Sequence, residues 1–144
     1  MAKKLLTSGD YTIKAGDGYN SGAGTNTVTI DSKDVSVAGT LTSNGNVFGV
    51  QTLTGSGSTG VVSLTETVTL LVTTGESQAF SLADGTEGQL KIISMKTDGG
   101  TGIVTPANFV NGTRITFDDV EDTVTLLYQS TGWVALARQN AVFS

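Results

Sequence analysis

Hydrophobic and polar residues alternate in short segments along the chain. From residue 61 onward, eight segments combine aliphatic or aromatic residues with Thr, and Gly, Asn, Asp or Ser recurs between them. A period of two is typical of β-strands, and turn signals spaced by about 8 to 12 residues are typical of a sandwich or small barrel. The pattern predicts strands over residues 61–64, 68–73, 78–82, 89–96, 102–106, 114–117, 123–129 and 132–138.

The clearest predicted hairpin spans residues 124–137. Two strand-like segments flank a short loop that ends in Gly132, and glycine supplies the backbone conformations that tight turns need. Residues 68–75 match the first half of this hairpin, which predicts a second, similar one. No window of sufficient length has a helical pattern, so the predicted fold class is all-β.

Residues 1–60 form short alternating segments, such as 27–31 and 35–38, with few aliphatic side chains. These are too few for an independent core, so we expect them to pack on the chain's own C-terminal domain or on another chain. The predicted contact residues are Val28, Ile30, Val35, Val37, Leu41 and Val47.

The predicted organisation is an extended, strand-rich N-terminal arm over residues 1–60, followed by a small antiparallel β-sandwich or barrel over residues 61–144. The Gly- and Ser-rich segment 54–60 is the predicted linker, because its residues offer little side-chain packing. Thr-Leu-Thr at residues 40–42 recurs at residues 52–54 and favours a stacked or extended arm.

The charge and the apolar runs of the sequence argue against nucleic-acid and membrane partners. Charged residues make up 15% of the chain, against about 25% in typical globular proteins, and the formal net charge is −5. Lys3 and Lys4 are the only adjacent basic pair, so we expect no nucleic-acid partner. No apolar run is long enough for a membrane span, and the start lacks the apolar stretch of a signal peptide. We expect a soluble protein made in a cytoplasm, with no membrane partner.

The chain contains no histidine and no cysteine. Ser-His-Asp and Cys-His catalysis and nearly all zinc sites are therefore excluded, and we predict no enzymatic activity and no cofactor. One acidic cluster could hold Ca²⁺ or supply a carboxylate pair, although an exposed turn is the preferred interpretation because neighbouring residues in a β context point to opposite faces. Its members are Asp118, Asp119, Glu121 and Asp122.

Two further features have competing interpretations. Residues 55–60 fit the dinucleotide pattern G-x-G-x-x-G, but strand sequence follows where that site needs a helix, so we favour the linker. Phe143 lies one residue from the end and is hard to assign to the core of its own domain. We predict that Phe143 contacts a neighbouring subunit.

Residues 28–47, with strands punctuated by Gly and Thr, resemble segments of tailed-phage virion proteins, including tail fibres, head fibres and capsid decoration proteins. Residues 88–100, Thr105-Pro-Ala-Asn, residues 115–120 and the hairpin around Trp133 resemble a β domain common in such proteins. The resemblance implies a homotrimer located in the virion.

Tail fibres are generally much longer, so the short chain favours a capsid decoration, or cement, protein at the capsid surface that binds the major capsid protein. By binding the assembled shell and not its parts, such a protein would stabilise the assembled state. The alternatives are a tail-fibre or neck attachment component and a carbohydrate-binding, adhesin-like module.

Overall fold

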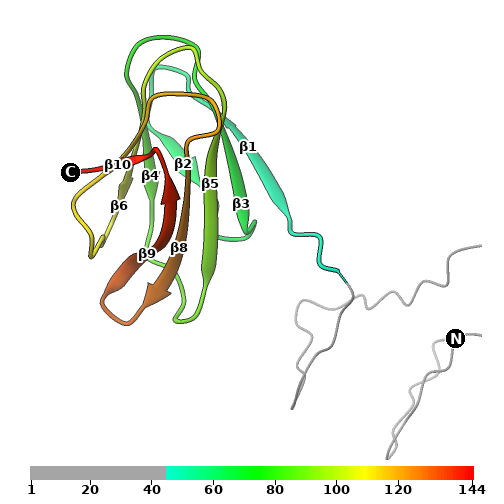
Figure 1. Cartoon of the computed structure of the whole chain (residues 1–144), viewed down its shortest axis with the longest axis vertical. Helices are drawn as coiled ribbons and strands as arrows, with labels where there is room; N and C mark the ends of the chain where they lie inside the picture. The colour runs from blue at the N-terminus through cyan, green and yellow to red at the C-terminus, as the bar shows by residue number, and fades with distance from the viewer. Residues whose placement is uncertain (1–44) are drawn as a thin grey trace, which may run out of the picture. The chain divides into compact units, whose positions relative to one another are not determined.

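The structure is a computed structural model, and it describes residues 45–144. Figure 1 shows this part of the chain as two β-sheets without a helix. The strands are β1 (Val50–Thr54), β2 (Gly60–Val62), β3 (Val68–Val72), β4 (Gln78–Leu82), β5 (Leu90–Thr97), β6 (Gly102–Pro106), β7 (Ile115–Phe117), β8 (Thr123–Gln129), β9 (Gly132–Gln139) and β10 (Val142–Phe143).

The first six strands alternate between the two sheets. Sheet A has the order β1-β3-β5-β8-β9, and sheet B has the order β10-β7-β6-β4-β2. Consecutive strands within one sheet are therefore separated by a strand of the other sheet, so β1, β3 and β5 run parallel, as do β2, β4 and β6. The chain winds through both sheets in successive coils, and β7 to β10 complete them with antiparallel strands.

The all-β prediction is confirmed, but the prediction of an antiparallel fold is wrong for the first six strands. Each sheet is mixed, and the two sheets are not closed into a barrel. The β8–β9 hairpin is confirmed, with Gln129 opposite Gly132. The second predicted hairpin is wrong, because β3 and β4 lie in different sheets. A strand order of this kind depends on long-range pairing, which a local pattern does not specify.

One hydrophobic core lies between the sheets. Most strands bury alternate side chains, as in β3, where Thr69 and Leu71 point inward. Trp133 is fully buried, and its Nε1 donates to the Ala83 carbonyl oxygen at 2.9 Å, so its only polar atom is satisfied. The buried apolar residues are Val62, Leu71, Phe80, Leu82, Ile93, Met95, Val104, Ile115, Phe117, Val124, Leu126, Trp133 and Ala141.

All eight predicted strands are present, with ends shifted by at most two residues, and two strands were not predicted. One is the short β10. The other is β1, which lies in the region predicted as an arm and pairs with β3 from Val50 to Thr54. The segment predicted as a linker is therefore the connection from β1 to β2 within one compact unit.

Candidate functional site

The outer face of sheet A is apolar. On each strand, the side chains that alternate with the buried ones point away from the core. We call the large hydrophobic residues at these outward positions the apolar face: Val50, Val68, Leu70, Val72, Leu90, Ile92, Leu127 and Val134.

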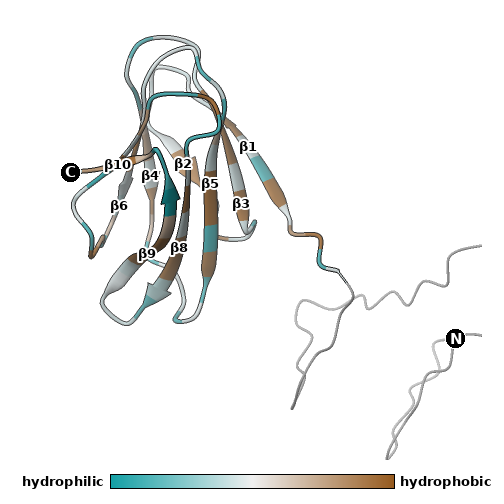
Figure 2. Ribbon diagram, viewed as in Figure 1, coloured by the Kyte–Doolittle hydropathy of each residue, from teal (hydrophilic) through white to brown (hydrophobic). Residues whose placement is uncertain are grey.

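Strand register brings these side chains together across the sheet. Val50, Val68 and Ile92 are neighbours on three adjacent strands. Leu127 lies opposite Leu90 on one side and opposite Val134 on the other. Paired side chains on one face of a sheet are about 5 Å apart, so the residues form a continuous surface. Figure 2 colours most of β3 and β5 as hydrophobic.

The apolar face differs from the outer face of sheet B. That second face has Ala79, Ser81, Thr105 and Thr116 at outward positions, together with three large hydrophobic residues, Val61, Ile103 and Val142, against eight on sheet A. On sheet A the only charged residue at an outward position within the described part is Lys96, at the irregular end of β5. A sheet face in water is normally polar, whereas surfaces that join proteins are depleted in charge. The apolar face has the character of an assembly surface.

The sequence carried a signal for this face that the strand prediction did not use. Val68-Thr-Leu-Leu-Val in β3 and Leu-Lys-Ile-Ile in β5 place apolar residues at both odd and even positions. Such runs are typical of strands that are covered on both faces.

The first coil of the chain, which is β1, β2 and the connection between them, also exposes hydrophobic residues on both sheets. Val50 and Val61 are exposed on β1 and β2, and so are Val47 and Phe48 just before β1. The sequence around them lacks charge, because no Asp, Glu, Lys or Arg occurs between Asp34 and Glu66, although Glu66 itself lies beside Gly49. Edge strands of soluble proteins are usually protected by such charges. The uncharged first coil is therefore a second candidate for contact with another chain.

Gln51 connects the two sheets at this edge. Its Nε2 donates to the Val61 carbonyl oxygen at 2.9 Å, and its Oε1 accepts from the Ser63 backbone N–H at 2.8 Å. Oε1 also accepts from the Thr69 hydroxyl at 3.0 Å. The side-chain amide of Gln51 thus supplies the donor and the acceptor that the backbone of a neighbouring strand would otherwise offer to β2.

Lys91 is a buried cation that the sequence analysis did not single out. It lies on the inward side of β5 with 0% of its surface exposed. Its Nζ donates to the carbonyl oxygens of Ser63 and Glu66 at 2.8 and 2.6 Å. Burial lowers the pKa of Lys91 to about 8, and the nearby Glu66 carboxylate opposes this shift. A hydrogen bond from the Ser63 hydroxyl, together with a smaller effect of Lys91, lowers the pKa of Glu66. The two hydrogen bonds of Lys91 hold the β2–β3 connection against sheet A.

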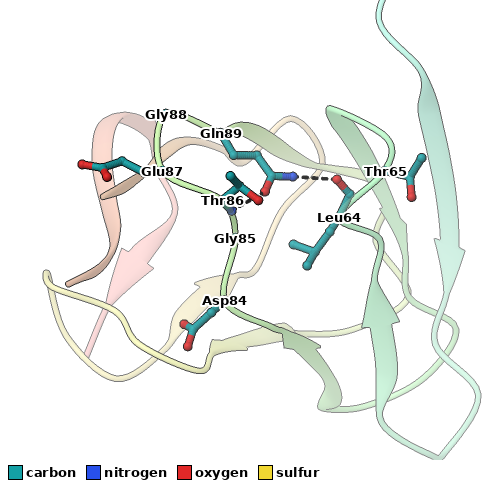
Figure 3. A pocket seen from close by; sticks show the side chains of 8 residues that line it. All are labelled: Leu64, Thr65, Asp84, Gly85, Thr86, Glu87, Gly88 and Gln89. Atoms are coloured by element: carbon teal, nitrogen blue, oxygen red, sulfur yellow. Dashed lines mark hydrogen bonds between the residues drawn. The ribbon is translucent and has the colours of Figure 1, made fainter. Parts of the chain in front are cut away.

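A shallow cleft lies at the ends of the strands, between the β2–β3 and β4–β5 connections (Figure 3). Its volume is about 530 Å³, and its lining residues are Leu64, Thr65, Asp84, Gly85, Thr86, Glu87, Gly88 and Gln89. Gln89 holds the two connections together, since its Nε2 donates to the Leu64 carbonyl oxygen at 2.6 Å and its Oε1 accepts from the Thr86 backbone N–H at 3.0 Å.

An exposed polar pair lies at the margin of the cleft. The Asn108 side-chain amide donates to both carboxylate oxygens of Asp84, at 3.0 and 2.8 Å. Burial and the Asp84 carboxylate raise the pKa of Tyr128. Carboxylate, amide and hydroxyl groups together are suited to a hydroxyl-rich ligand, and they offer no nucleophile paired with a base.

The acidic cluster forms a turn between β7 and β8. Asp118, Asp119 and Glu121 are exposed, whereas Asp122 is buried. Asp122 Oδ2 accepts the backbone N–H groups of Asp118 and Asp119 at 2.8 and 3.1 Å. Its role is to close the turn. Among residues 45–144, no three acidic side chains converge to hold a metal ion.

Two of the predicted contact residues lie in the described part of the chain. Val47 is fully exposed. Phe143 is half-buried in its own domain, where its ring meets Phe109 edge-on at 5.1 Å and Arg138 at 4.6 Å. Its contact with a neighbouring subunit stays a prediction. The other five predicted contacts, Val28, Ile30, Val35, Val37 and Leu41, lie outside the described residues.

The remaining motif does not form a cofactor site. Residues 55–60 turn from β1 into β2, so a strand follows the glycine pattern where a dinucleotide site needs a helix. In the described range, no helix is long and apolar enough to cross a membrane.

Comparison of the chain with protein-family models gave no match, and comparison with curated protein sequences gave none either.

Proposed function

We propose that this chain is a non-enzymatic structural protein of a tailed-phage particle, which acts by assembling with copies of itself and with the capsid. A homotrimeric capsid decoration protein at the head surface is the preferred form. A tail-fibre or neck attachment component is the nearest alternative, and it would use the same assembly surface.

The observation that carries this proposal is the apolar face of sheet A. Eight large hydrophobic side chains occupy its outward positions, from Val50 on β1 to Val134 on β9. Val50 is exposed and the other seven are partly exposed, with Thr and Ser at the outward positions between them. Apolar surface left in contact with water is costly and often marks a protein interface. Copies of an acidic chain repel one another, and a surface almost free of charge is where they can meet closely.

The described chemistry agrees with a structural role. The sequence has no histidine or cysteine, and the buried polar side chains bind backbone groups: Lys91 binds the β2–β3 connection, and Asp122 binds its own turn. The resemblance to phage virion proteins supplies the identity of the larger partner, the major capsid protein.

The first test is the mass of the full chain in solution, measured by light scattering. We expect three times the 14.7 kDa of one chain. Leu70→Lys places a charge on the apolar face and should lower this mass. Ile103→Lys is the matched control, because Ile103 is also half-buried and faces outward on sheet B. A monomeric wild-type protein would refute self-assembly.

The second test concerns the capsid. The full chain should co-sediment with emptied heads of the phage that encodes it and should leave the supernatant at a fixed ratio to capsid protein. A trimer that ignores heads but binds isolated tails would support the attachment alternative.

A carbohydrate-binding module is a second candidate, and the cleft beside Asp84 and Asn108 favours it. A glycan array decides between the two functions. Binding to specific glycans that Asp84→Ala abolishes, without binding to heads, would replace the structural proposal.

A further inference from the structure

We propose that the free edge of β1 receives a β-strand from a second copy of this chain, so that sheet A continues from one subunit into the next. This inference rests on the proposed self-assembly and identifies the edge through which it occurs. It depends on backbone geometry at β1 and not on the apolar face alone.

The backbone of β1 faces β3 on one side only. Val68 N–H donates to the Gly49 carbonyl oxygen at 3.1 Å, at the start of β1. Gly55 N–H donates to the Val72 carbonyl oxygen at 2.9 Å, just after its end. In a parallel pair every second residue bonds to the neighbouring strand, so Gln51 and Leu53 also bond to β3. The N–H and C=O groups that point away from β3 belong to the residues between them, Val50, Thr52 and Thr54.

These outward groups have no strand beside them within residues 45–144, where β1 is the last strand of sheet A. The other edge of this first coil is different. The Gln51 side chain occupies the edge of β2 through its hydrogen bonds to Val61 and Ser63. One edge is thus capped by the chain itself, and β1 keeps a row of backbone donors and acceptors that another strand can match.

The side chains of β1 are suited to strand addition. Val50-Gln-Thr-Leu-Thr has β-branched residues, and it lacks the charges and proline that natural edge strands use to prevent pairing. The residues leading into β1 are exposed, and Figure 1 shows them running away from the two sheets. Within residues 45–144, no strand lies on the outer side of β1.

A copy of the same chain is the occupant that the proposed self-assembly requires, and charge restricts where two copies can meet. Residues 45–144 contain nine acidic and four basic residues, which accounts for the whole net charge of −5. Copies that approach by most other surfaces bring acidic loops together. Val50 belongs both to the edge and to the apolar face, so a copy that covers this face also reaches the edge. Each copy offers one β1 edge, so strand addition is head-to-tail, and the proposed trimer requires a threefold rotation between copies for the ring to close.

Amide hydrogen exchange of the full chain, resolved to single residues, tests the inference. The amides of Gln51 and Leu53 serve as internal controls, because β3 protects them in every state. We expect the amides of Val50, Thr52 and Thr54 to exchange at least tenfold more slowly in the assembled protein than in the monomer fraction obtained by dilution. Fast exchange in the assembly would overturn the proposal. Protection that persists in the monomer would also overturn it, because the strand would then come from the same chain.

Variants provide the complementary test. Thr52→Pro removes an outward N–H and leaves the bonds to β3 in place, so we expect a dissociation constant raised about tenfold or more. Val50→Lys should act in the same direction. Val110→Lys is its matched control, since Val50 and Val110 are 54% and 56% exposed. Thermal unfolding shows whether each variant is folded.

The outcomes separate this inference from the proposed function. Assembly that survives both edge variants but not Leu70→Lys overturns strand addition and leaves the structural role intact. A dimer with protected β1 amides supports strand addition and contradicts the trimer. Assembled protein that does not bind heads or tails refutes the virion role while the edge contact stands.

Discussion

Lys91 gives the most specific prediction about stability. The folded protein holds this ammonium group away from water, and its pKa is lowered from 10.5 to about 8, mainly by burial. Each pH unit of difference corresponds to about 1.4 kcal/mol, so keeping the charge inside costs about 3 kcal/mol at pH 7.

The direction of the pH dependence follows from proton binding. Between pH 8 and 10.5 the unfolded chain keeps a proton that the folded protein has released, so the free energy of unfolding rises with pH in this window. Below pH 8 Lys91 is protonated in both the folded and the unfolded protein, so the full free-energy cost of burying its charge is present. Above pH 10.5 Lys91 is neutral in both the folded and the unfolded protein, and burying it no longer costs the free energy of a buried charge. The neutral amine keeps two N–H donors, enough for the carbonyl oxygens of Ser63 and Glu66.

The perturbation is Lys91→Met, which retains the length of the side chain and removes the titrating group. Urea unfolding of both proteins, at one protein concentration and at several pH values from 7 to 10.5, gives the difference in their free energies of unfolding. Wild type should gain up to about 3 kcal/mol relative to the variant across this range. The shifted pKa of Glu66 is an acidic one and does not contribute in this window. A constant difference, or one that changes in the opposite direction, would refute the assignment of a buried ammonium ion.

Three further predictions concern side chains around the core. Gln51→Ala exposes the edge of β2 and removes three hydrogen bonds, so it should lower the free energy of unfolding by about 1 to 3 kcal/mol in urea titrations. Gly85→Ala places a methyl group 2.8 Å from the Trp133 ring, and we expect a loss of about 1 to 3 kcal/mol together with a change in tryptophan fluorescence. The pKa of Tyr128 is raised by burial and by Asp84, so this phenol should ionise at higher pH than a free tyrosine when absorbance is followed at alkaline pH. Asp84→Asn should move that titration to lower pH, and an unchanged titration would contradict the contact.

The candidate site was predictable only in part. The sequence analysis expected residues 1–60 to pack on the chain's own C-terminal domain or on another chain, and its contact list included Val47, which is exposed; the contact itself stays a prediction. The analysis missed the apolar face because it used apolar residues only to locate strands. It also missed Lys91, since a lone lysine within a strand pattern is normally exposed.

By itself, the local pattern of apolar and polar residues determined eight of the ten strands of the described residues, and it did not identify β1 and β10. Alternation with a period of two is a property of each strand's own backbone, so residues 68–72 or 123–129 required no knowledge of their neighbours. The tertiary structure decided which strands pair. Parallel winding through two sheets joins residues far apart in the chain, such as Val50 and Val68, and the energy of that pairing resides in contacts between segments and not within any one of them. The apolar face, the Gln51 cap and the place of β1 at the edge of sheet A within residues 45–144 follow from that pairing.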